Sequence, residues 1–231
     1  MSTQDQPSDL PRHLGIIIDG NRRWAKLNGL PTLEGHKRGF DAVKRVIKAA
    51  HDRGIRTLTI FCFSTENWNR SREEVGYLMD LLKKTLAGYF SEFEKQDIRI
   101  QVIGQKDRLS EDIQQEIIKV EKGTEKNTGM TVNLALSYGG RAEIVDAVKK
   151  IIKNGIDPDA ITEDTIKDNL WTSDVDLVIR TGGEQRLSGF LLWQAAYSEF
   201  LFVKKYWPEF SESDLDGALA DYAARQRRFG K

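Results

Sequence analysis

The sequence predicts a single α/β domain with a mostly parallel central sheet of about six strands flanked by helices. Short apolar runs such as LGIII and LTIFCF are typical of strands buried on both faces. Helical patterns separate these runs, and no Pro-, Ser- or Gly-rich linker divides the 231 residues. The expected strands are Leu14–Asp19, Thr57–Ser64, Ile98–Gly104, Thr131–Ser137, Asp176–Arg180 and Phe200–Val203.

Helices are expected where apolar residues recur along one helical face. Ser71 with Glu74, and Ser211 with Asp214, form capping-box patterns that mark two helix starts. The apolar run Phe190–Phe202 is expected to form a short helix that runs into the last strand. The three expected apolar faces are Phe40, Val43, Val46, Ile47 and Ala50; Val75, Leu78, Met79, Leu82 and Leu86; and Ile144, Val145, Val148 and Ile152.

Composition limits the partners and the compartment. Lys and Arg together number 35, as do Asp and Glu, so the chain lacks the basic excess of a nucleic-acid binder and any anion site must be local. Cys62 is the only cysteine, which favours a reducing, cytoplasmic location. No apolar run approaches the roughly 20 residues needed to span a bilayer. Residues 1–12 are polar, lack a signal-peptide core and are expected to be flexible.

Four polar segments follow four expected strands: DGNRRW, STENWNR, YGGR and RTGGEQRLS. Ligands of open α/β sheets bind beyond the carboxyl ends of the strands, so we expect these segments to form one site. In the first, Asp19 is a hard oxygen ligand suited to Mg²⁺, and Gly20 lets backbone N–H groups approach an anion. Arg22, Arg23 and Lys26 favour this interpretation over a plain strand-to-helix turn.

The second segment offers groups for proton transfer and phosphate binding. Glu66 or Asn67 could orient a proton transfer, and Arg70 could bind phosphate. The alternative is a helix-entry loop in which Trp68 is only a hydrophobic plug. His36, in the GHKRG segment that opens a helix, adds an anion donor, although a solvated first turn explains that segment equally well.

The densest cluster is RTGGEQRLSGF. Arg180, Arg186 and Ser188 can converge on one diphosphate, and the pair Gly182 and Gly183 permits a backbone anion nest. The cluster matches neither GxxxxGK[ST] nor GxGxxG, which argues against a nucleotide-binding enzyme. Further along, Glu199 sits in an apolar context and needs a partner or a metal.

These motifs, in this order, resemble the cis-prenyltransferases. HLGIIIDGNRRWAK, GHKRG, FSTENWNR, SYGGR and DLVIRTGGEQRLSGFLLWQAAYSEFLF carry the resemblance, which extends from His13 to Gly230. It implies a homodimeric α/β enzyme whose catalytic domain spans residues 13–231. Such enzymes condense isopentenyl diphosphate onto an allylic diphosphate, usually farnesyl diphosphate, with Mg²⁺.

The resemblance also implies roles for individual residues. Asp19 would act at the metal and the diphosphate, Glu199 at the metal and the dimer interface, and Asn67 with Ser64 in proton removal. Arg22 departs from the glycine of many members, and Gln185 from the histidine of some. The substrate contacts expected are Gly20, Asn21, Arg23, His36 and Arg70 for the allylic diphosphate, Arg180, Arg186 and Ser188 for isopentenyl diphosphate, Arg228 and Gly230 for the partner's site, and Arg22 and Trp24 without assignment to one substrate.

Two questions stay open at this point: whether the chain acts alone, and how long its product is. A non-catalytic subunit of the same fold is disfavoured because Asp19 and the arginines are present; a helical trans-type synthase is disfavoured because no DD pair occurs. Small Cys62 favours a medium or undecaprenyl product for the lipid carrier of cell-wall glycan synthesis, with a shorter product as the alternative. Such a product would bring the enzyme to the inner membrane face. The expected tunnel lining is Ile16, Ile18, Leu78, Leu82, Leu86 and Leu134.

Overall fold

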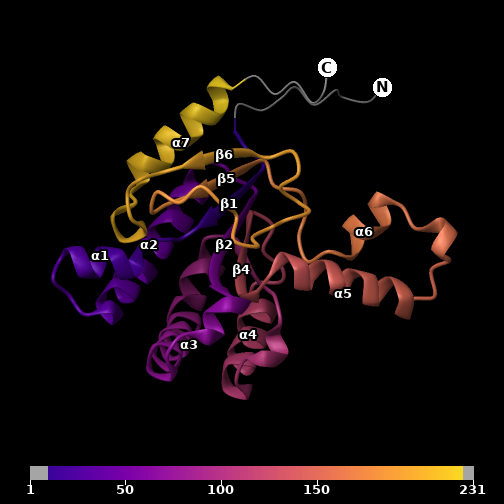
Figure 1. Cartoon of the computed structure of the whole chain (residues 1–231), viewed down its shortest axis with the longest axis horizontal. Coiled ribbons are helices and arrows are strands. Elements are labelled where there is room, and N and C mark those ends of the chain that lie inside the picture. Colours follow the sequence, from indigo (N-terminus) through magenta and orange to yellow (C-terminus); the bar gives the residue numbers. More distant parts are fainter. Residues whose placement is uncertain (1–9, 226–231) are drawn as a thin grey trace.

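The computed structural model describes residues 10–225, apart from the side chains of residues 89–92 and 94. One six-stranded sheet with the order β3-β4-β2-β1-β5-β6 forms the centre of this part of the chain (Figure 1). Every pair of neighbouring strands is parallel, so the predicted fold class is confirmed. The strands are β1 His13–Ile17, β2 Thr57–Ser64, β3 Ile98–Ile103, β4 Met130–Tyr138, β5 Leu177–Arg180 and β6 Glu199–Phe202.

Helices and short 3₁₀ turns connect the strands. The helix starts predicted at Ser71 and Ser211 are confirmed, because their hydroxyl groups accept the backbone N–H groups of Glu74 and Asp214. The helices are α1 Asn21–Leu27, α2 Thr32–Asp52, α3 Arg72–Lys95, α4 Glu111–Gly123, α5 Gly140–Lys153, α6 Glu163–Asn169 and α7 Glu212–Ala224. The 3₁₀ turns are η1 Thr65–Asn69, η2 Lys106–Arg108, η3 Pro158–Ala160 and η4 Trp207–Glu209.

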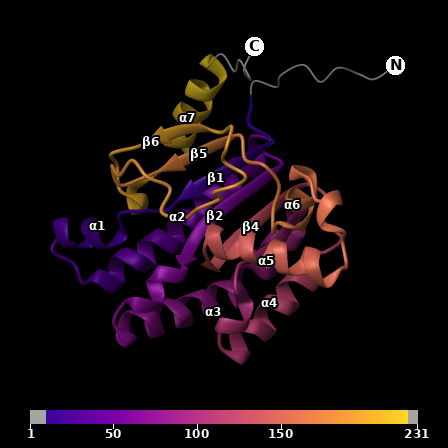
Figure 2. The same ribbon diagram turned by 45° about the vertical axis from the view of Figure 1, so that its right-hand side comes forward.

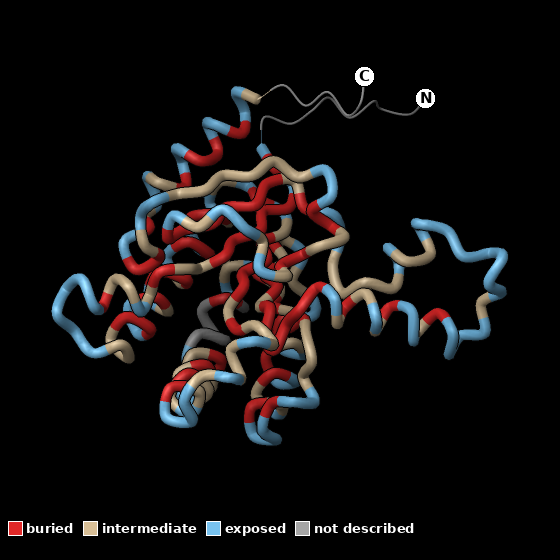
Figure 3. The backbone as a smooth tube through the Cα atoms, in the orientation of Figure 1, coloured by how far each residue is buried: buried red, intermediate tan, exposed pale blue. Residues whose placement is uncertain are grey.

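The two faces of the sheet bury different sets of side chains. Side chains alternate between the faces along a strand, so Ile16 and Ile60 pack with α2, α3, α4 and α7, whereas Ile17 and Phe61 point to the opposite face. That second face is covered mainly by the chain before and after β5, including Phe190. Figures 2 and 3 show the helices gathered below and above the sheet and the buried backbone at its centre.

Helix α5 does not bury the face predicted for it. Val145, Val148 and Ile152 are 53%, 41% and 71% exposed, whereas Ala147 and Ile151 of the same helix are buried. In Figure 1, α5 and α6 extend away from the sheet as an arm. The apolar residues do recur at helical spacing, as predicted. Because the helix projects away from the sheet, its apolar face remains exposed to solvent.

The short helix predicted in the run Phe190–Phe202 is also wrong, because the residues of this run before β6 form a series of turns. Ser188, Gly189 and Leu191 have φ values of 51°, 83° and 45°. Left-handed residues this close together are incompatible with a right-handed helix. The turns instead place Phe190 and Leu191, both fully buried, against the second face of the sheet.

The chain order creates a crevice at the centre of the sheet. Strand β1 leads to β2 on one side, and its neighbour β5 leads to β6 on the other. The carboxyl ends of β1 and β5 therefore form the topological switch point at which open α/β sheets bind ligands. Asp19 comes two residues after β1, and Arg180 is the last residue of β5.

Glycines bring α1 close to α2 beside this crevice. A Cβ atom at Gly35 would lie 2.2 Å from the backbone oxygen of Asn21, and one at Gly39 would lie 2.5 Å from the Asn21 side-chain oxygen. The glycines of the GHKRG segment are thus needed for helix packing, while His36 between them lines the crevice.

The chain approaches β1 through Arg12, which is held in place. Its backbone N–H donates to Asp176 Oδ2 at 2.9 Å, and its carbonyl oxygen accepts from the Thr57 N–H at 2.9 Å. Residues 1–9 of the predicted flexible segment lie outside the described residues. Within residues 10–225, none of the helices combines the length and the apolar composition that a membrane span requires.

Candidate active site

A large polar pocket opens at the switch point. Its volume is about 850 Å³, and it is bounded by α1, the start of α2 and the segments after β1, β2 and β5. Its lining includes six basic side chains but only one carboxylate, that of Asp19. Because the whole chain is neutral, the positive charge is local, as the sequence predicts. The basic residues are Arg22, Arg23, Lys26, Arg70, Arg180 and Arg186.

Asp19 is held between two arginines. Its Oδ2 accepts a hydrogen bond from Arg180 Nη2 at 2.8 Å, and its Oδ1 lies 3.0 Å from Arg23 Nη2. Burial alone would raise the pKa of Asp19, but the hydrogen bonds from Arg180 and Arg23 outweigh it and hold that pKa below its usual value. The carboxyl group is therefore ionised at neutral pH.

Arg180 also organises the loop that follows β5. Its side chain is only 5% exposed, and its Nη1 donates to Ser188 Oγ at 2.9 Å and to the Arg186 carbonyl oxygen. The Thr181 hydroxyl donates to the Asp19 carbonyl oxygen at 2.7 Å, which joins the two strand exits. The structure thus brings together Asp19, Arg180, Arg186 and Ser188, as predicted.

A second carboxylate, Glu184, bridges two of the pocket arginines. Its Oε1 accepts from Arg23 Nη1 at 3.2 Å and its Oε2 from Arg186 Nη1 at 2.6 Å. All three side chains are partly exposed, so an anion that enters the pocket can compete with Glu184 for both guanidinium groups.

The backbone nest predicted at the glycine pair is wrong. The N–H of Gly182 donates to the Lys205 carbonyl oxygen at 2.8 Å. The N–H of Gly183 donates to the Val203 carbonyl oxygen at 2.9 Å. Both donors are already used within the fold. Gly182 is required for another reason, because its φ of 85° lies in the left-handed region that other residues rarely adopt.

Across the pocket, a second group of cationic side chains surrounds Glu74. Its Oε1 accepts from His36 Nε2 and from Arg70 Nη1, each at 3.0 Å, and Arg22 Nε lies 3.9 Å away. Burial lowers the pKa of His36, although the hydrogen bond to Glu74 opposes this change. A neutral His36 must then carry its proton on Nε2, because a carboxylate can only accept.

Ser64 and Asn67 line the pocket at the end of β2. The Asn67 side-chain oxygen accepts the Ser64 backbone N–H at 3.1 Å, which fixes the carboxamide at the start of η1. Trp68 packs against the Phe63 ring and donates to Ser137 Oγ at 2.9 Å. Trp68 is therefore the hydrophobic plug that the sequence allowed as an alternative.

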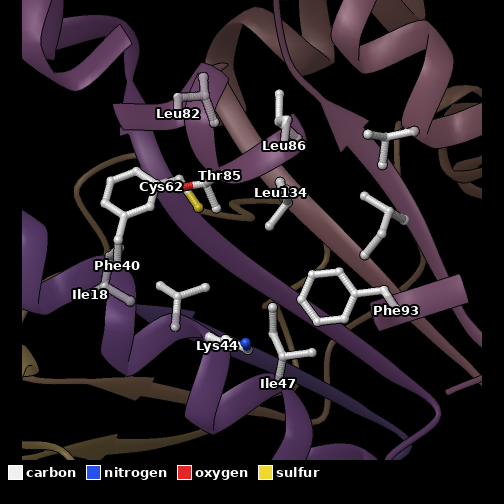
Figure 4. Close-up of a pocket in the computed structure, with 13 residues that line it drawn as sticks. Ile18, Phe40, Lys44, Ile47, Cys62, Leu82, Thr85, Leu86, Phe93 and Leu134 are labelled. Atoms are coloured by element: carbon white, nitrogen blue, oxygen red, sulfur yellow. The ribbon is translucent and has the colours of Figure 1, made fainter. Parts of the chain in front are cut away.

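An apolar cavity continues inward from the polar pocket. Ile18, Phe40 and Cys62 belong to the linings of both, so these side chains form a throat between them. The cavity is narrow, with a volume of about 40 Å³, and Figure 4 shows the rings of Phe40 and Phe93 on opposite sides of it. Four of the expected tunnel residues line it: Ile18, Leu82, Leu86 and Leu134. Ile16 is core instead, and Leu78 lines the polar pocket.

Comparison with known proteins identifies the family. The model of the Prenyltransf family of undecaprenyl diphosphate synthases matches residues 17–230. The chain belongs to the undecaprenyl diphosphate synthase family. An isoprenyl transferase of Chromobacterium violaceum is 46% identical over 96% of this chain and 88% of its own length. A farnesyl-diphosphate-specific ditrans,polycis-undecaprenyl-diphosphate synthase of Aliivibrio fischeri is 44% identical over 96% and 89%.

Two solved structures share the fold. The lavandulyl diphosphate synthase of Lavandula x intermedia, in complex with dimethylallyl diphosphate, aligns with a TM-score of 0.93 and 43% identity over 96% of this chain and 99% of that one. A probable undecaprenyl diphosphate synthase from Campylobacter jejuni aligns with a TM-score of 0.83 and 32% identity over the same shares. This member of the undecaprenyl diphosphate synthase family is therefore a prenyl-transferring enzyme.

The structure does not bring every predicted residue of this family member into the pocket. Trp24 lies outside the lining because its indole N–H donates to Glu209 Oε1 at 3.0 Å. Glu199 pairs with Arg225 at 2.8 Å and begins β6, in register with Leu177 at the amino end of β5. Within one chain it is thus at the opposite end of the strands from Asp19, and the two do not form one metal site. Arg228 and Gly230 lie outside the described residues.

Sequence reasoning missed three residues of the site. Glu74 was interpreted only as a helix-capping residue, and Glu184 was not assigned a role, although both contact pocket arginines. Tyr206 was not considered; its ring lies 5.4 Å from the Arg23 guanidinium and packs against Gly20. The available signal for Glu184 was an acidic residue inside the otherwise basic RTGGEQR segment, and that for Glu74 was an acidic residue shortly after the STENWNR segment.

Proposed function

We propose that the protein condenses isopentenyl diphosphate onto an allylic diphosphate, with farnesyl diphosphate as primer, to give a cis-polyprenyl diphosphate. The observation that carries this proposal is one basic pocket, with Asp19 and Arg180 at its centre, that opens into an apolar cavity. The reaction needs two anion sites and a place for a hydrocarbon chain. The arrangement offers a cation group on each side of the pocket and apolar space beneath.

The two substrates divide the pocket between them in this proposal. His36, Arg70 and Arg22 on the Glu74 side, together with Gly20, Asn21 and Arg23, take the allylic diphosphate. Arg180, Arg186 and Ser188 take isopentenyl diphosphate, because Arg180 already holds Ser188 and the Arg186 backbone in one place. Guanidinium groups suit this work because they remain charged and bind phosphate oxygens through paired donors.

The donor set fits Mg²⁺. Asp19 supplies one ionised carboxylate oxygen pair, and Mg²⁺ is commonly held by one or two carboxylates together with substrate phosphates. When bound, Mg²⁺ would stabilise negative charge on the departing diphosphate. Glu199 can contribute a ligand only from a second copy, since its own chain keeps it away from Asp19.

Asn67 and Ser64 would assist the removal of a proton from the isopentenyl unit. In the condensation a carbon–oxygen bond to the allylic diphosphate breaks, a carbon–carbon bond forms, and a proton leaves the isopentenyl unit. The carboxamide oxygen of Asn67 is occupied by Ser64 N–H, so the Asn67 amide N–H groups and the Ser64 hydroxyl would orient the diphosphate that receives this proton.

Incorporation of labelled isopentenyl diphosphate by the purified protein tests the proposal. We expect turnover with farnesyl diphosphate that needs Mg²⁺, stops with EDTA and is lost in Asp19→Ala. Turnover by the protein alone would exclude a non-catalytic subunit. Full activity of a folded Asp19→Ala variant would overturn the assignment.

Product length separates two candidates. A medium or undecaprenyl product, serving as the lipid carrier of cell-wall glycan synthesis, follows from the family resemblance. A shorter product is favoured by the narrow apolar cavity, which Phe40 restricts at its throat. Chromatography of the dephosphorylated product distinguishes the two directly.

A homodimer and a cytoplasmic location at the inner membrane face complete the proposal. The exposed apolar residues of α5, Val145, Val148 and Ile152, offer a surface that a second copy can cover. Sedimentation of the wild-type protein and of a Val148→Asp variant tests the dimer. Flotation with liposomes, with and without product, tests the membrane contact.

A further inference from the structure

Glu74 is a buried carboxylate that lies behind the polar pocket. It sits in the first turn of α3 and is only 8% exposed. One oxygen, Oε1, accepts hydrogen bonds from His36 Nε2 and Arg70 Nη1, and the same oxygen faces Arg22 Nε. A buried carboxylate needs such partners, because an unpaired charge in this position would be costly.

The three partners come from three different parts of the chain. Arg22 belongs to α1, His36 to α2, and Arg70 to the turn between η1 and α3. All three line the polar pocket, whereas Glu74 does not. The carboxylate therefore contacts them from the protein side and leaves the other guanidinium donors of Arg22 and Arg70 for a ligand.

The two guanidinium partners, Arg22 and Arg70, keep binding capacity after this contact. A guanidinium has five N–H donors, and the hydrogen bond to Glu74 uses one of those on Arg70 Nη1. The negative charge of Glu74 also offsets the repulsion between the two neighbouring guanidinium groups, Arg22 and Arg70. Donors that are ordered before a ligand arrives lose less entropy when they bind it.

We propose that Glu74 is a positioning residue that sets Arg70 and Arg22 for the allylic diphosphate and fixes the orientation of His36. This inference rests on the proposed function and adds a residue that never touches the substrate. It predicts that the charge of Glu74 strengthens anion binding, although a carboxylate near an anion site would by simple repulsion weaken it.

The isosteric variant Glu74→Gln tests the inference, with Glu73→Gln as matched control. Glu73 lies in the same helical turn but is exposed and does not line the pocket. We expect Glu74→Gln to raise the KM for farnesyl diphosphate by about tenfold or more, the loss of one charge-assisted hydrogen bond. The KM for isopentenyl diphosphate and the melting temperature should change little, and Glu73→Gln should behave like the wild type.

Two results would overturn the inference: a KM for farnesyl diphosphate that falls in Glu74→Gln, or KM values for both substrates that rise equally. Glu74→Asp keeps the charge but places it one methylene further from its partners, so it should raise the KM for farnesyl diphosphate by less than Glu74→Gln does. If Glu74→Gln does not fold, Glu74→Asp takes its place as the test variant. A wild-type enzyme without turnover would refute the proposed function instead, so the two failures are distinguishable.

Discussion

The ion pair between Asp19 and Arg180 should stabilise the fold as well as form the site. Arg180 is almost fully buried and Asp19 is 27% exposed at the side chain. Breaking a buried pair typically costs 3–5 kcal/mol. Asp19 remains partly hydrated and keeps Arg23 as a partner, so we expect Arg180→Met to lower the free energy of unfolding by about 2–4 kcal/mol. For a chain of this size that corresponds to a fall in Tm of about 5–15 °C.

A double-mutant cycle isolates the pair. Urea unfolding of Asp19→Asn, Arg180→Met and the double variant, at one protein concentration, should give a coupling free energy of about 1–3 kcal/mol. The matched control is the pair of Arg53 and Asp216, which is more exposed than the pair of Arg180 and Asp19 and whose coupling should be smaller. If the Asp19 and Arg180 effects add without coupling, the reasoning that one carboxylate joins β1 to β5 is refuted.

Three further predictions follow from the same geometry. Phe40→Ala should widen the throat and lengthen the product; an unchanged chain-length distribution on chromatography would contradict this. Because the pKa of folded Asp19 is depressed, its contribution to the free energy of unfolding should be present above about pH 4 and be lost as pH falls through the folded pKa. When unfolding is measured as a function of pH, Asp19→Asn should make the free energy of unfolding depend less on pH in this range. Gly35→Ala should cost about 1–3 kcal/mol through overlap with the Asn21 carbonyl, whereas Gly76→Ala, which meets no atom within 4 Å, should raise Tm slightly.

The central strands were predictable because they are buried on both faces. Runs such as LGIII and LTIFCF carry apolar side chains toward both faces of a strand, so the strand must be covered on both faces. Strand β2 has the predicted bounds Thr57–Ser64. The site followed from the same logic, since polar loops after parallel strands meet at one edge. This reasoning predicts that Asp19 and Arg180 lie at the same edge of the sheet, where the structure pairs them.

The errors arose where local pattern does not determine tertiary contacts. The apolar period of α5 shows that one face is apolar but not whether anything covers it, and Val145 and Ile152 remain exposed. The apolar run after Gly189 favours a helix locally, but the left-handed Ser188 and Leu191 and burial against the sheet override that preference. The paired glycines permit a nest, yet long-range hydrogen bonds to Lys205 and Val203 occupy their N–H groups.

The two unpredicted carboxylates explain how a neutral chain can keep a strongly basic pocket ready for anions. Glu184 is 35% exposed at its side chain and bridges Arg23 and Arg186, so an entering diphosphate can displace it at little cost. Glu74 is 10% exposed and tied to His36 and Arg70, so its removal from them would leave a buried charge unpaired. Glu184 is therefore suited to be exchanged for substrate and Glu74 to remain in place. Sequence alone cannot separate these roles, because each residue is a glutamate close to arginines in the chain and the sequence does not show which of the two is buried.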